Sequence, residues 1–225
     1  MSAVMATALP LLTELPETLP LLPLSGVILL PQARLPLNIF EPRYMTMIDN
    51  TLGQKGRMIG LIQPNILENK DNISPSLYKI GCAGRISSFT ETEDGRYLIN
   101  LTGICRFTIL EELPRELPYR TARLDWHSYA DDLTPADEAD INRKHLIETL
   151  ENYFKIQGIV ADWNAVQNTP SDMLISSLVM ICPLPPNEKQ ALLEASDLKS
   201  RAELLKTLLE MASLPQGESE GSARH

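Results

Sequence analysis

The chain has 225 residues, of which 44% are hydrophobic and 22% are charged, and its formal net charge is -9. This is the composition of a globular protein long enough for one large domain or two small ones. An acidic surface repels nucleic-acid phosphates and anionic membranes, and no run of lysines and arginines supplies a local basic patch. We therefore expect neither nucleic acid nor membrane among its partners.

The cysteines and the first residues of the chain indicate a reducing compartment. Cys82, Cys105 and Cys182 are sparse and lack a CxxC spacing, so we expect buried free thiols rather than a disulfide framework. The N-terminal stretch has no basic start typical of a signal peptide and is interrupted by Glu14 and Glu17. No run approaches the roughly 18 apolar residues of a membrane span. We expect a cytoplasmic protein.

The first half of the chain is rich in strand patterns. Residues 1–18 are expected to be a flexible leader, because Pro10 and Pro16 interrupt them. Residues 19–126 are expected to form a β-rich lobe. The clearest hairpin surrounds "TEDG", where Asp94-Gly95 offers the positive φ of a tight turn. Strands are expected at "LPLLPL" (19–24), "VILLP" (27–31), "RMIGLIQP" (57–64), on both sides of the turn within 80–110, and at "TARLDW" (121–126).

An acidic segment, "HSYADDLTPADEAD" (127–140), marks the change from strands to helices. The first helix is expected to begin at Pro135, with Thr134 as N-cap and Asp137 completing a capping-box-like pattern. It should run to about Gln157 and stop at Gly158, because glycine readily adopts the left-handed conformation that ends helices. Its expected apolar stripe consists of Ile147, Leu150 and Phe154.

Three more helices are expected after this one. Thr169-Pro170 repeats the start signal, with Asp172 in the first turn, and that helix should end before Pro183. The next begins in "PPNEKQALLEA" (185–195), and Ser196 is the expected cap of "DLKSRAELLKTLLEMA" (197–212). We therefore expect a helical bundle lobe over 133–212 and a disordered tail over 213–225. Strands followed by helices indicate the α+β class.

Motifs that carry catalysis or bind metals are missing from the sequence. It contains no GxxxxGK[ST], GxGxxG, HExxH or GxSxG pattern. His127, His145 and His225 are too scattered for a shared zinc site, which prefers dense Cys/His spacing. The acidic segment lacks the glycine and the alternating ligands of a calcium loop. We predict no catalytic residue, no cofactor and no metal, and thus no enzyme.

The stretch "IFEPRYM" (39–45) is interpreted as a helix start. Pro42 suits the first helical position, Glu41 then falls at the N-cap, and Phe40 and Met45 have the spacing of a hydrophobic staple. Glu41 and Arg43 could orient each other or a neighbouring strand. The buried face is expected to comprise Tyr44, Ile48 and Leu52, with Gly53 closing the helix.

From "LPLLPLSGVILLPQARLPLNIFEPRYMTMIDNTL" through "GCAGRISSF", "GRYLINLTGICRFTI" and "YRTARLDW" to "PLPPNEKQALLEASDLKSRAELLKTLL", the chain resembles the N-terminal, substrate-binding domain of Lon ATP-dependent proteases. The resemblance covers about residues 18–212. It implies a β-rich pseudo-barrel lobe, distantly like RNA-binding PUA domains, followed by a helical bundle. The family's ATPase and Ser–Lys protease domains would begin where this chain ends, so a stand-alone, non-catalytic Lon-domain protein is expected.

Two functions follow from this resemblance and from the missing motifs. The leading one is a module, adaptor or holdase in protein quality control, that binds unfolded or exposed apolar polypeptide segments, with other proteolysis components as further partners. The alternative is a small-molecule or peptide-terminus sensor with a pocket between the β lobe and the helices, where arginine would clamp carboxylates. An enzyme of unknown class and an RNA-binding protein are weaker alternatives. The candidate binding residues are Arg34, Phe40, Glu41, Arg43, Tyr44 and Arg85.

Overall fold

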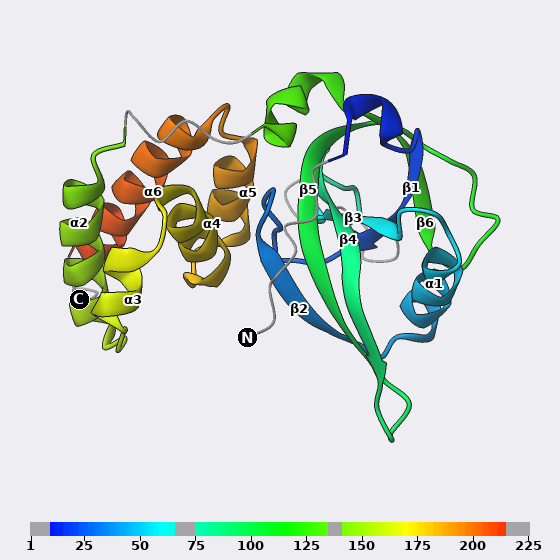
Figure 1. The fold of residues 1–225 in the computed structure, drawn as a ribbon, viewed down its shortest axis with the longest axis horizontal. Coiled ribbons are helices and arrows are strands. Elements are labelled where there is room, and N and C mark those ends of the chain that lie inside the picture. The colour runs from blue at the N-terminus through cyan, green and yellow to red at the C-terminus, as the bar shows by residue number, and fades with distance from the viewer. Residues whose placement is uncertain (1–9, 66–74, 135–140, 215–225) are drawn as a thin grey trace, which may run out of the picture.

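A computed structural model describes residues 10–65, 75–134 and 141–214 of the chain. Figure 1 shows two parts side by side: a curled β-sheet with one helix on its far side, and a group of helices. The α+β class, with a β-rich lobe before a helical lobe, is therefore confirmed.

The β lobe is built on one six-stranded sheet that closes on itself. The sheet order is β2-β5-β4-β3-β1-β6, and β6 also pairs with β5, which turns the sheet into the expected pseudo-barrel. All pairings are antiparallel except the one between β1 and β3. The strands are β1 (Thr18–Pro23), β2 (Arg34–Ile39), β3 (Met58–Ile62), β4 (Ile80–Glu91), β5 (Tyr97–Glu112) and β6 (Arg120–Asp125).

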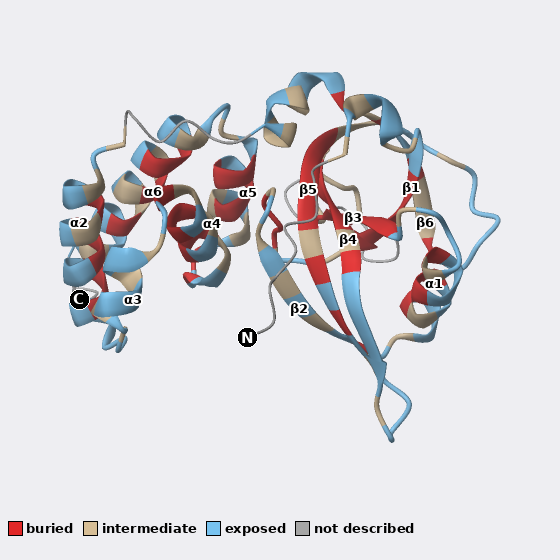
Figure 2. Cartoon of the chain, in the orientation of Figure 1, coloured by how far each residue is buried: buried red, intermediate tan, exposed pale blue. Residues whose placement is uncertain are grey.

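The β4–β5 hairpin has the expected turn. Gly95 has a φ of 76°, and the amide of Thr92 donates to the carbonyl of Arg96 across the turn. The two strands stay paired out to Glu91 and Tyr97, so the hairpin extends well beyond the core. Figure 2 shows its tip exposed while the inner parts of both strands are buried.

The segment "VILLP" is buried but is not a strand, so that prediction is wrong. Gln32 has a φ of 63°, and the amide of Ala33 folds back to the carbonyl of Leu30. The segment then crosses β5 so closely that a Cβ on Gly103 would lie 2.0 Å from the Leu30 carbonyl oxygen. Its apolar side chains are therefore buried without regular pairing, and the adjacent strand β2 was not predicted.

Helix α1 (Pro42–Leu52) begins and ends as predicted, with Glu41 as N-cap and Gly53 as C-cap. Its buried face consists of Tyr44, Met47, Ile48 and Thr51, whereas Leu52 is only partly buried. The expected staple is wrong at one end, because the Phe40 side chain is 64% exposed. Met45 packs on the core by itself.

The helical lobe differs from the predictions mainly at helix starts. The first helix does not run continuously from residue 135, because Ile141 and Asn142 are not helical. Asn142 is its cap and accepts from the amide of His145. A short helix that follows was not predicted, although Asp162 caps it by accepting from two backbone amides. The helices are α2 (Arg143–Gln157), α3 (Trp163–Asn168), α4 (Ser171–Ile181), α5 (Pro186–Glu194) and α6 (Leu198–Ser213), preceded by the 3-10 helix η3 (His127–Leu133).

Other details of these helices correct or confirm the expectations. Gly158 ends α2 in the left-handed conformation, as predicted, with a φ of 67°. Pro170, rather than Thr169, caps α4, and Asp197, rather than Ser196, caps α6 through its bond from the amide of Ser200. The predicted apolar stripe of α2 is confirmed at Leu150 and Phe154 and wrong at Ile147, which is only partly buried. The buried stripe consists of Leu146, Thr149, Leu150, Tyr153 and Phe154.

The main hydrophobic core runs through both lobes. One cluster of buried side chains joins strand residues such as Leu22 and Ile59 to helix residues such as Leu150 and Leu205. A second cluster fills the barrel around Phe107. The three cysteines are free and buried, as expected. Figure 2 shows this burial along the inner faces of strands and helices.

Part of the expected leader is ordered. Residues 12–14 form a short 3-10 helix, η1 (Leu12–Glu14), and the indole of Trp126 donates to the carbonyl of Pro16. Leu12 and Leu15 pack on the barrel cluster. Residues 1–9, the expected helix start at Pro135 and Asp137, and the tail beyond residue 214 lie outside the described residues.

Candidate functional site

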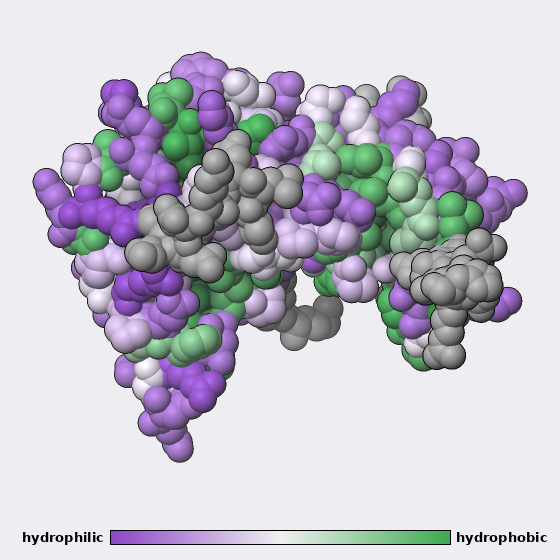
Figure 3. Space-filling model, turned by 180° about the vertical axis from the view of Figure 1, so that it is seen from behind, coloured by the Kyte–Doolittle hydropathy of each residue, from purple (hydrophilic) through white to green (hydrophobic). Residues whose placement is uncertain are grey.

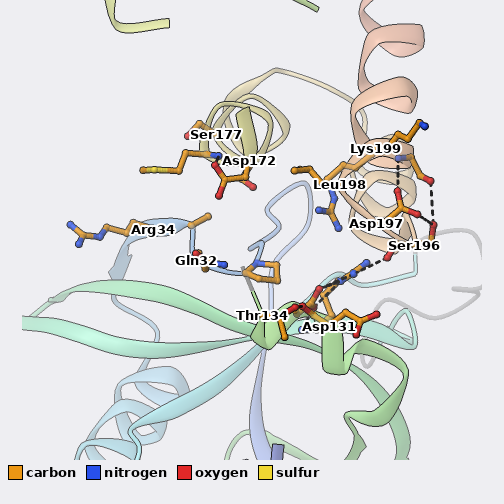
Figure 4. Close-up of a pocket in the computed structure, with 18 residues that line it drawn as sticks. Gln32, Arg34, Asp131, Thr134, Asp172, Ser177, Ser196, Asp197, Leu198 and Lys199 are labelled. Carbon is orange, nitrogen blue, oxygen red and sulfur yellow. Dashed lines mark hydrogen bonds and ion pairs between the residues drawn. The ribbon is translucent and has the colours of Figure 1, made fainter. Parts of the chain in front are cut away.

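A cleft of about 950 Å³ lies between the β lobe and the helical lobe. Figure 4 shows its labelled side chains arranged around a hollow, with β2 on one side, the helices opposite and η3 below. Polar groups predominate in its lining, and a few apolar side chains lie among them. It is lined by Pro31, Gln32, Ala33, Arg34, Arg106, Asp131, Asp132, Thr134, Asp172, Met173, Ser176, Ser177, Ser196, Asp197, Leu198, Lys199, Ser200 and Arg201.

One wall of this interlobe cleft is the start of β2 and the turn before it. Among the described strands, β2 pairs only with β5, which leaves its other edge without a partner strand. This second edge lies on the side of the sheet toward the helical lobe (Figure 1). The strand is positioned by the turn at Gln32, whose amide donates to the carbonyl of Gly103. The guanidinium of Arg34 is exposed and forms no ion pair or hydrogen bond with any other described residue.

The opposite wall is formed by the first turns of α4 and α6. Met173 projects from α4 with 57% of its surface exposed, beside the hydroxyls of Ser176 and Ser177. Asp197 is held in place as the cap of α6, and the pKa of its carboxyl is lowered, first by the bond from the Ser200 amide. This wall therefore presents small polar groups around a flexible apolar side chain.

The floor of the cleft is a buried arginine network that joins the lobes. Arg106, on β5, forms an ion pair with Asp132 of η3 at 2.8 Å and donates to the carbonyls of Leu193, Ala195 and Ser196. Burial lowers the pKa of Arg106, but the hydrogen bond and charge of Asp132 outweigh this effect and leave the pKa raised. Arg106 therefore stays charged at neutral pH.

Arg201 lies beside this network. Its guanidinium donates to the carbonyl of Leu192, at the end of α5 (Pro186–Glu194). Burial, and then the charge of Arg106, lower its pKa to about 10. The carbonyls at the C-terminal end of a helix carry partial negative charge, so they favour this second buried cation.

Most charged groups of the cleft are engaged in structural bonds. Its arginines are committed to structural bonds, apart from Arg34, and none of its hydroxyls is hydrogen-bonded to a histidine in the described chain. The cysteine thiols lie elsewhere, and burial raises the pKa of Cys105 to about 12 and that of Cys182 to about 11, so thiolates are scarce at neutral pH. No group of three metal-binding side chains occurs among the described residues.

The structure places the six predicted binding residues in three separate regions. Arg34 lines the interlobe cleft. The start of α1 holds four of them, on the side of the β lobe away from the helices (Figure 1): Phe40, Glu41, Arg43 and Tyr44. Arg85 lies on β4, in a smaller cleft that shares no lining residue with the first.

Glu41 and Arg43 form an ion pair with each other. The guanidinium donates to one carboxylate oxygen at 2.9 and 2.7 Å and also lies 4.6 Å from the centre of the Tyr44 ring. Burial, first among several causes, raises the pKa of Tyr44. The pair thus stabilises the start of α1 locally. Of the four predicted residues there, only Phe40 is a large exposed apolar side chain.

Sequence reasoning missed most of the cleft. Met173, Ser176 and Ser177 fall on a helix for which no exposed face was predicted, and the serines carry no motif. The one available signal was the helix period, which separates Met173 and Ser177 from Leu174 and Leu178. No sequence pattern predicted the role of Arg106, because its bonding partners lie in η3 and in the α5–α6 connection, far from it in the sequence.

Comparisons with solved structures show the same fold. A Lon N-terminal domain protein from Xanthomonas campestris has a TM-score of 0.58 at 22% identity, covering 84% of this chain and 97% of that one. The N-terminal domain of Mycobacterium avium complex Lon protease has a TM-score of 0.58 at 16% identity, covering 86% of this chain and 98% of that one.

Curated relatives agree with this likeness. Lon protease 2 of Myxococcus xanthus is 27% identical over 201 residues, which are 87% of this chain and 24% of that protein. Lon protease of Flavobacterium johnsoniae is 30% identical over 197 residues, 84% of this chain and 23% of that protein. The chain thus spans about a quarter of the length of these relatives.

None of the described helices combines the length and apolar character needed to cross a bilayer. The family described as the ATP-dependent protease La (LON) substrate-binding domain matches residues 18–211, nearly all of the two lobes. The chain therefore belongs to the Lon substrate-binding domain family.

Proposed function

We propose that this chain is a non-catalytic polypeptide-binding module that holds exposed apolar segments of unfolded proteins in the interlobe cleft. It would act as an adaptor or holdase in protein quality control, in the cytoplasm and beside other proteolysis components, without a cofactor. The observation that carries this function is a cleft of about 950 Å³ with an unpaired strand edge on one wall. Membership of a substrate-binding family supports it.

The open edge of β2 suits an extended chain. An edge strand directs half of its backbone N–H and C=O groups away from its neighbour, and an added peptide strand can bond to them whatever its sequence. Pro36 removes one donor from β2, and at the cleft the amides of Gln32 and Ala33 already donate to Gly103 and Leu30. An added strand would therefore bond to β2 at Arg34, where the strand reaches the cleft. Backbone bonding of this kind supports recognition of many different clients.

The helical wall supplies an adaptable apolar contact. Methionine fills irregular spaces because its side chain is flexible and polarisable, which suits partners of varied shape. Met173 is the exposed methionine of the cleft. On the face seen in Figure 3, apolar side chains lie in separate patches over both lobes, divided by hydrophilic groups.

The test is to block the cleft. Ser177→Trp adds an indole to the cleft wall, and Ile181→Trp adds the same group to the end of α4, where Ile181 is exposed and does not line the cleft. A reduced and alkylated client that cannot refold would be labelled, and its binding measured by fluorescence anisotropy against its native form. We expect micromolar binding of the unfolded client, weakened about tenfold by Ser177→Trp and unchanged by Ile181→Trp.

Two results would contradict the proposal. Equal binding of the native and unfolded client would mean that exposed segments are not recognised. Full binding by Ser177→Trp would mean that the cleft is not the site, and Phe40→Ser would then test the apolar group at the start of α1. Thermal unfolding of each variant would confirm that the fold is retained.

A second function is favoured by one observation, the free guanidinium of Arg34 at the edge of the cleft. Arginine binds carboxylates through two parallel hydrogen bonds, so Arg34 could select a peptide C-terminus or a small acid. A peptide with a free C-terminus would then bind more tightly than its amidated form, and Arg34→Gln would remove the difference. Equal affinity of both forms for the wild-type chain would exclude this function.

A further inference from the structure

A second cleft, of about 580 Å³, lies on the β lobe where the loop between α1 and β3 meets β4. It shares no lining residue with the interlobe cleft and plays no part in the proposed function. It is lined by Pro10, Glu14, Pro16, Lys55, Gly56, Arg57, Met58 and Arg85. We refer to it as the basic cleft.

The charge of the basic cleft is opposite to that of the chain. Three cations, Lys55, Arg57 and Arg85, share it with a single acid, Glu14, although the whole chain has a net charge of -9. Glu14 is engaged by the backbone, because its carboxylate accepts from the amide of Leu11 at 2.9 Å. Within residues 10–65, 75–134 and 141–214, none of the three cationic side chains forms an ion pair or hydrogen bond.

Arg85 carries an independent sign of a missing partner. Its Nε–H is fully buried and has no hydrogen-bond acceptor. Buried donors are almost always paired, and an exception in a folded chain indicates a bound water, ion or ligand group. Arg85 is held in this position because it lies opposite Met58 in the β3–β4 pairing. The sheet thus holds Arg85, one of the residues that line the basic cleft, in a fixed position.

The loop beside it has a strained backbone. Arg57 has a φ of 49°, a conformation that side chains other than glycine, asparagine and aspartate rarely adopt, and Gly56 before it has a φ of 100°. The carbonyl of Arg57 accepts from the amide of Ile86, which ties the loop to β4. Such strain concentrates at ligand-binding loops. Here it brings the side chain of Arg57 to the same cleft as that of Arg85.

We propose that the basic cleft binds a doubly charged tetrahedral oxyanion of the phosphate type, either free or carried on a larger molecule. Three cations and one acid leave two positive charges, which match a phosphate dianion at neutral pH better than a single carboxylate. Arginine donors bind phosphate oxygens in bidentate fashion, and Arg57 and Arg85 line the basic cleft with no ion pair to another described residue.

The experiment is an NMR titration of the full chain with inorganic phosphate, at constant ionic strength maintained with chloride. We expect saturable shifts of the backbone amides around residues 55–58 and 85–86. Arg85→Gln and Arg57→Gly should each weaken the affinity at least tenfold. Glycine accepts the positive φ of residue 57 without strain, so we expect Arg57→Gly to fold. It therefore tests the site even if Arg85→Gln is unstable. Arg96→Gln, which alters an exposed arginine paired with Asp94 at the hairpin, should bind as the wild type does.

The source of the oxyanion is decided by two further probes. A phosphoserine peptide that binds more tightly than inorganic phosphate would identify a phosphoryl group on a larger molecule, whereas tighter binding of inorganic phosphate would identify the free ion. Shifts that do not saturate, or that persist in Arg57→Gly, would overturn the site. A glutamate peptide that binds as tightly as phosphate would overturn the preference for a dianion.

Discussion

At the residue scale, two ion pairs of similar length differ in value because of burial. The Glu41–Arg43 pair spans 2.7 Å with both side chains about half exposed, whereas the Arg106–Asp132 pair spans 2.8 Å with side chains 4% and 10% exposed. Water screens the first pair, and entropy opposes its ordering. The buried Arg106–Asp132 pair has lost its hydration, so each charge depends on the other for stabilisation. Sequence position alone does not distinguish them.

The first prediction compares these arginines. Arg106→Met leaves Asp132 buried without its cation, and we expect the free energy of unfolding to fall by about 3–5 kcal/mol. Arg43→Gln should cost less than about 1 kcal/mol, since the pair at the start of α1 is exposed. Urea unfolding followed by circular dichroism measures both. Arg106→Met/Asp132→Leu should recover part of the loss, and equal effects of the two single changes would contradict this account.

The second prediction concerns the thiols. Burial raises the pKa of Cys105 to about 12 and that of Cys182 to about 11, and it also raises the pKa of Cys82. An unfolded thiol ionises near pH 8.5, so the stability that these groups contribute is complete below that pH and is lost as the pH rises above it. We expect iodoacetamide to modify the native chain far more slowly than the urea-unfolded chain at pH 8. Equal rates would contradict the burial of the thiols.

At the scale of elements, side-chain caps mark where three of the described helices begin. Asn142, Asp162 and Asp197 each accept a backbone amide in the first turn of their helix, α2, α3 and α6 respectively. The expected start at Pro135 relied on proline and acids, which are compatible with a helix start without requiring one. A side chain that reaches an amide is the stronger signal.

The third prediction tests the cap of α6. Asp197→Ala should cost about 0.5–2 kcal/mol of stability, because the Ser200 amide loses its acceptor. The folded-state pKa of Asp197 is lowered, so its contribution is present above the unfolded pKa near 4 and is lost as the pH falls through the folded value. Asp197→Asn should retain most stability at pH 7 and reduce the acid dependence. Glu203→Gln, an exposed change later in α6, is the control.

The fold was predictable where local signals agreed. The "TEDG" turn and the end of α2 at Gly158 each rest on a positive φ that few residue types adopt, and the start of α1 rests on Pro42, whose ring fixes a helical φ. The strand predicted at "VILLP" is wrong, because apolar side chains can be buried without strand pairing. This segment reaches the core by crossing Gly103, which lies about 70 residues further along the chain, and no local pattern encodes that contact.

At the scale of the whole molecule, the lobes behave as one body because both polar and apolar groups join them. Arg106 binds the α5–α6 connection, and Gln63 donates to the carbonyl of Pro186 and to Gln190. The main hydrophobic cluster is continuous across the same junction. The interlobe cleft is therefore a fixed feature between tied lobes, rather than a gap that opens freely.

This junction also explains why the candidate site was only partly predictable. The alternative function placed Arg34, Arg43 and Arg85 at a pocket between the lobes, and of these three only Arg34 lines the interlobe cleft. Its remaining lining comes from the turn at Gln32, from η3 and from the first turns of α4 and α6, which are far apart in the sequence. Their proximity is a property of the packed lobes, so it could not be inferred from the pattern of any one segment.

The last prediction tests the coupling of the lobes with the two tryptophans of the chain. Trp126 lies buried at the end of the barrel, and Trp163 opens α3 and packs on Phe154. With 5-fluorotryptophan, each lobe gives its own ¹⁹F signal without any mutation. In the wild type both signals should lose native intensity at the same urea concentration, because the shared core makes unfolding cooperative. Arg106→Met should separate the two midpoints, as the junction loses its central cation while each lobe keeps its own packing. Coincident midpoints in that variant would show that the apolar core alone couples the lobes.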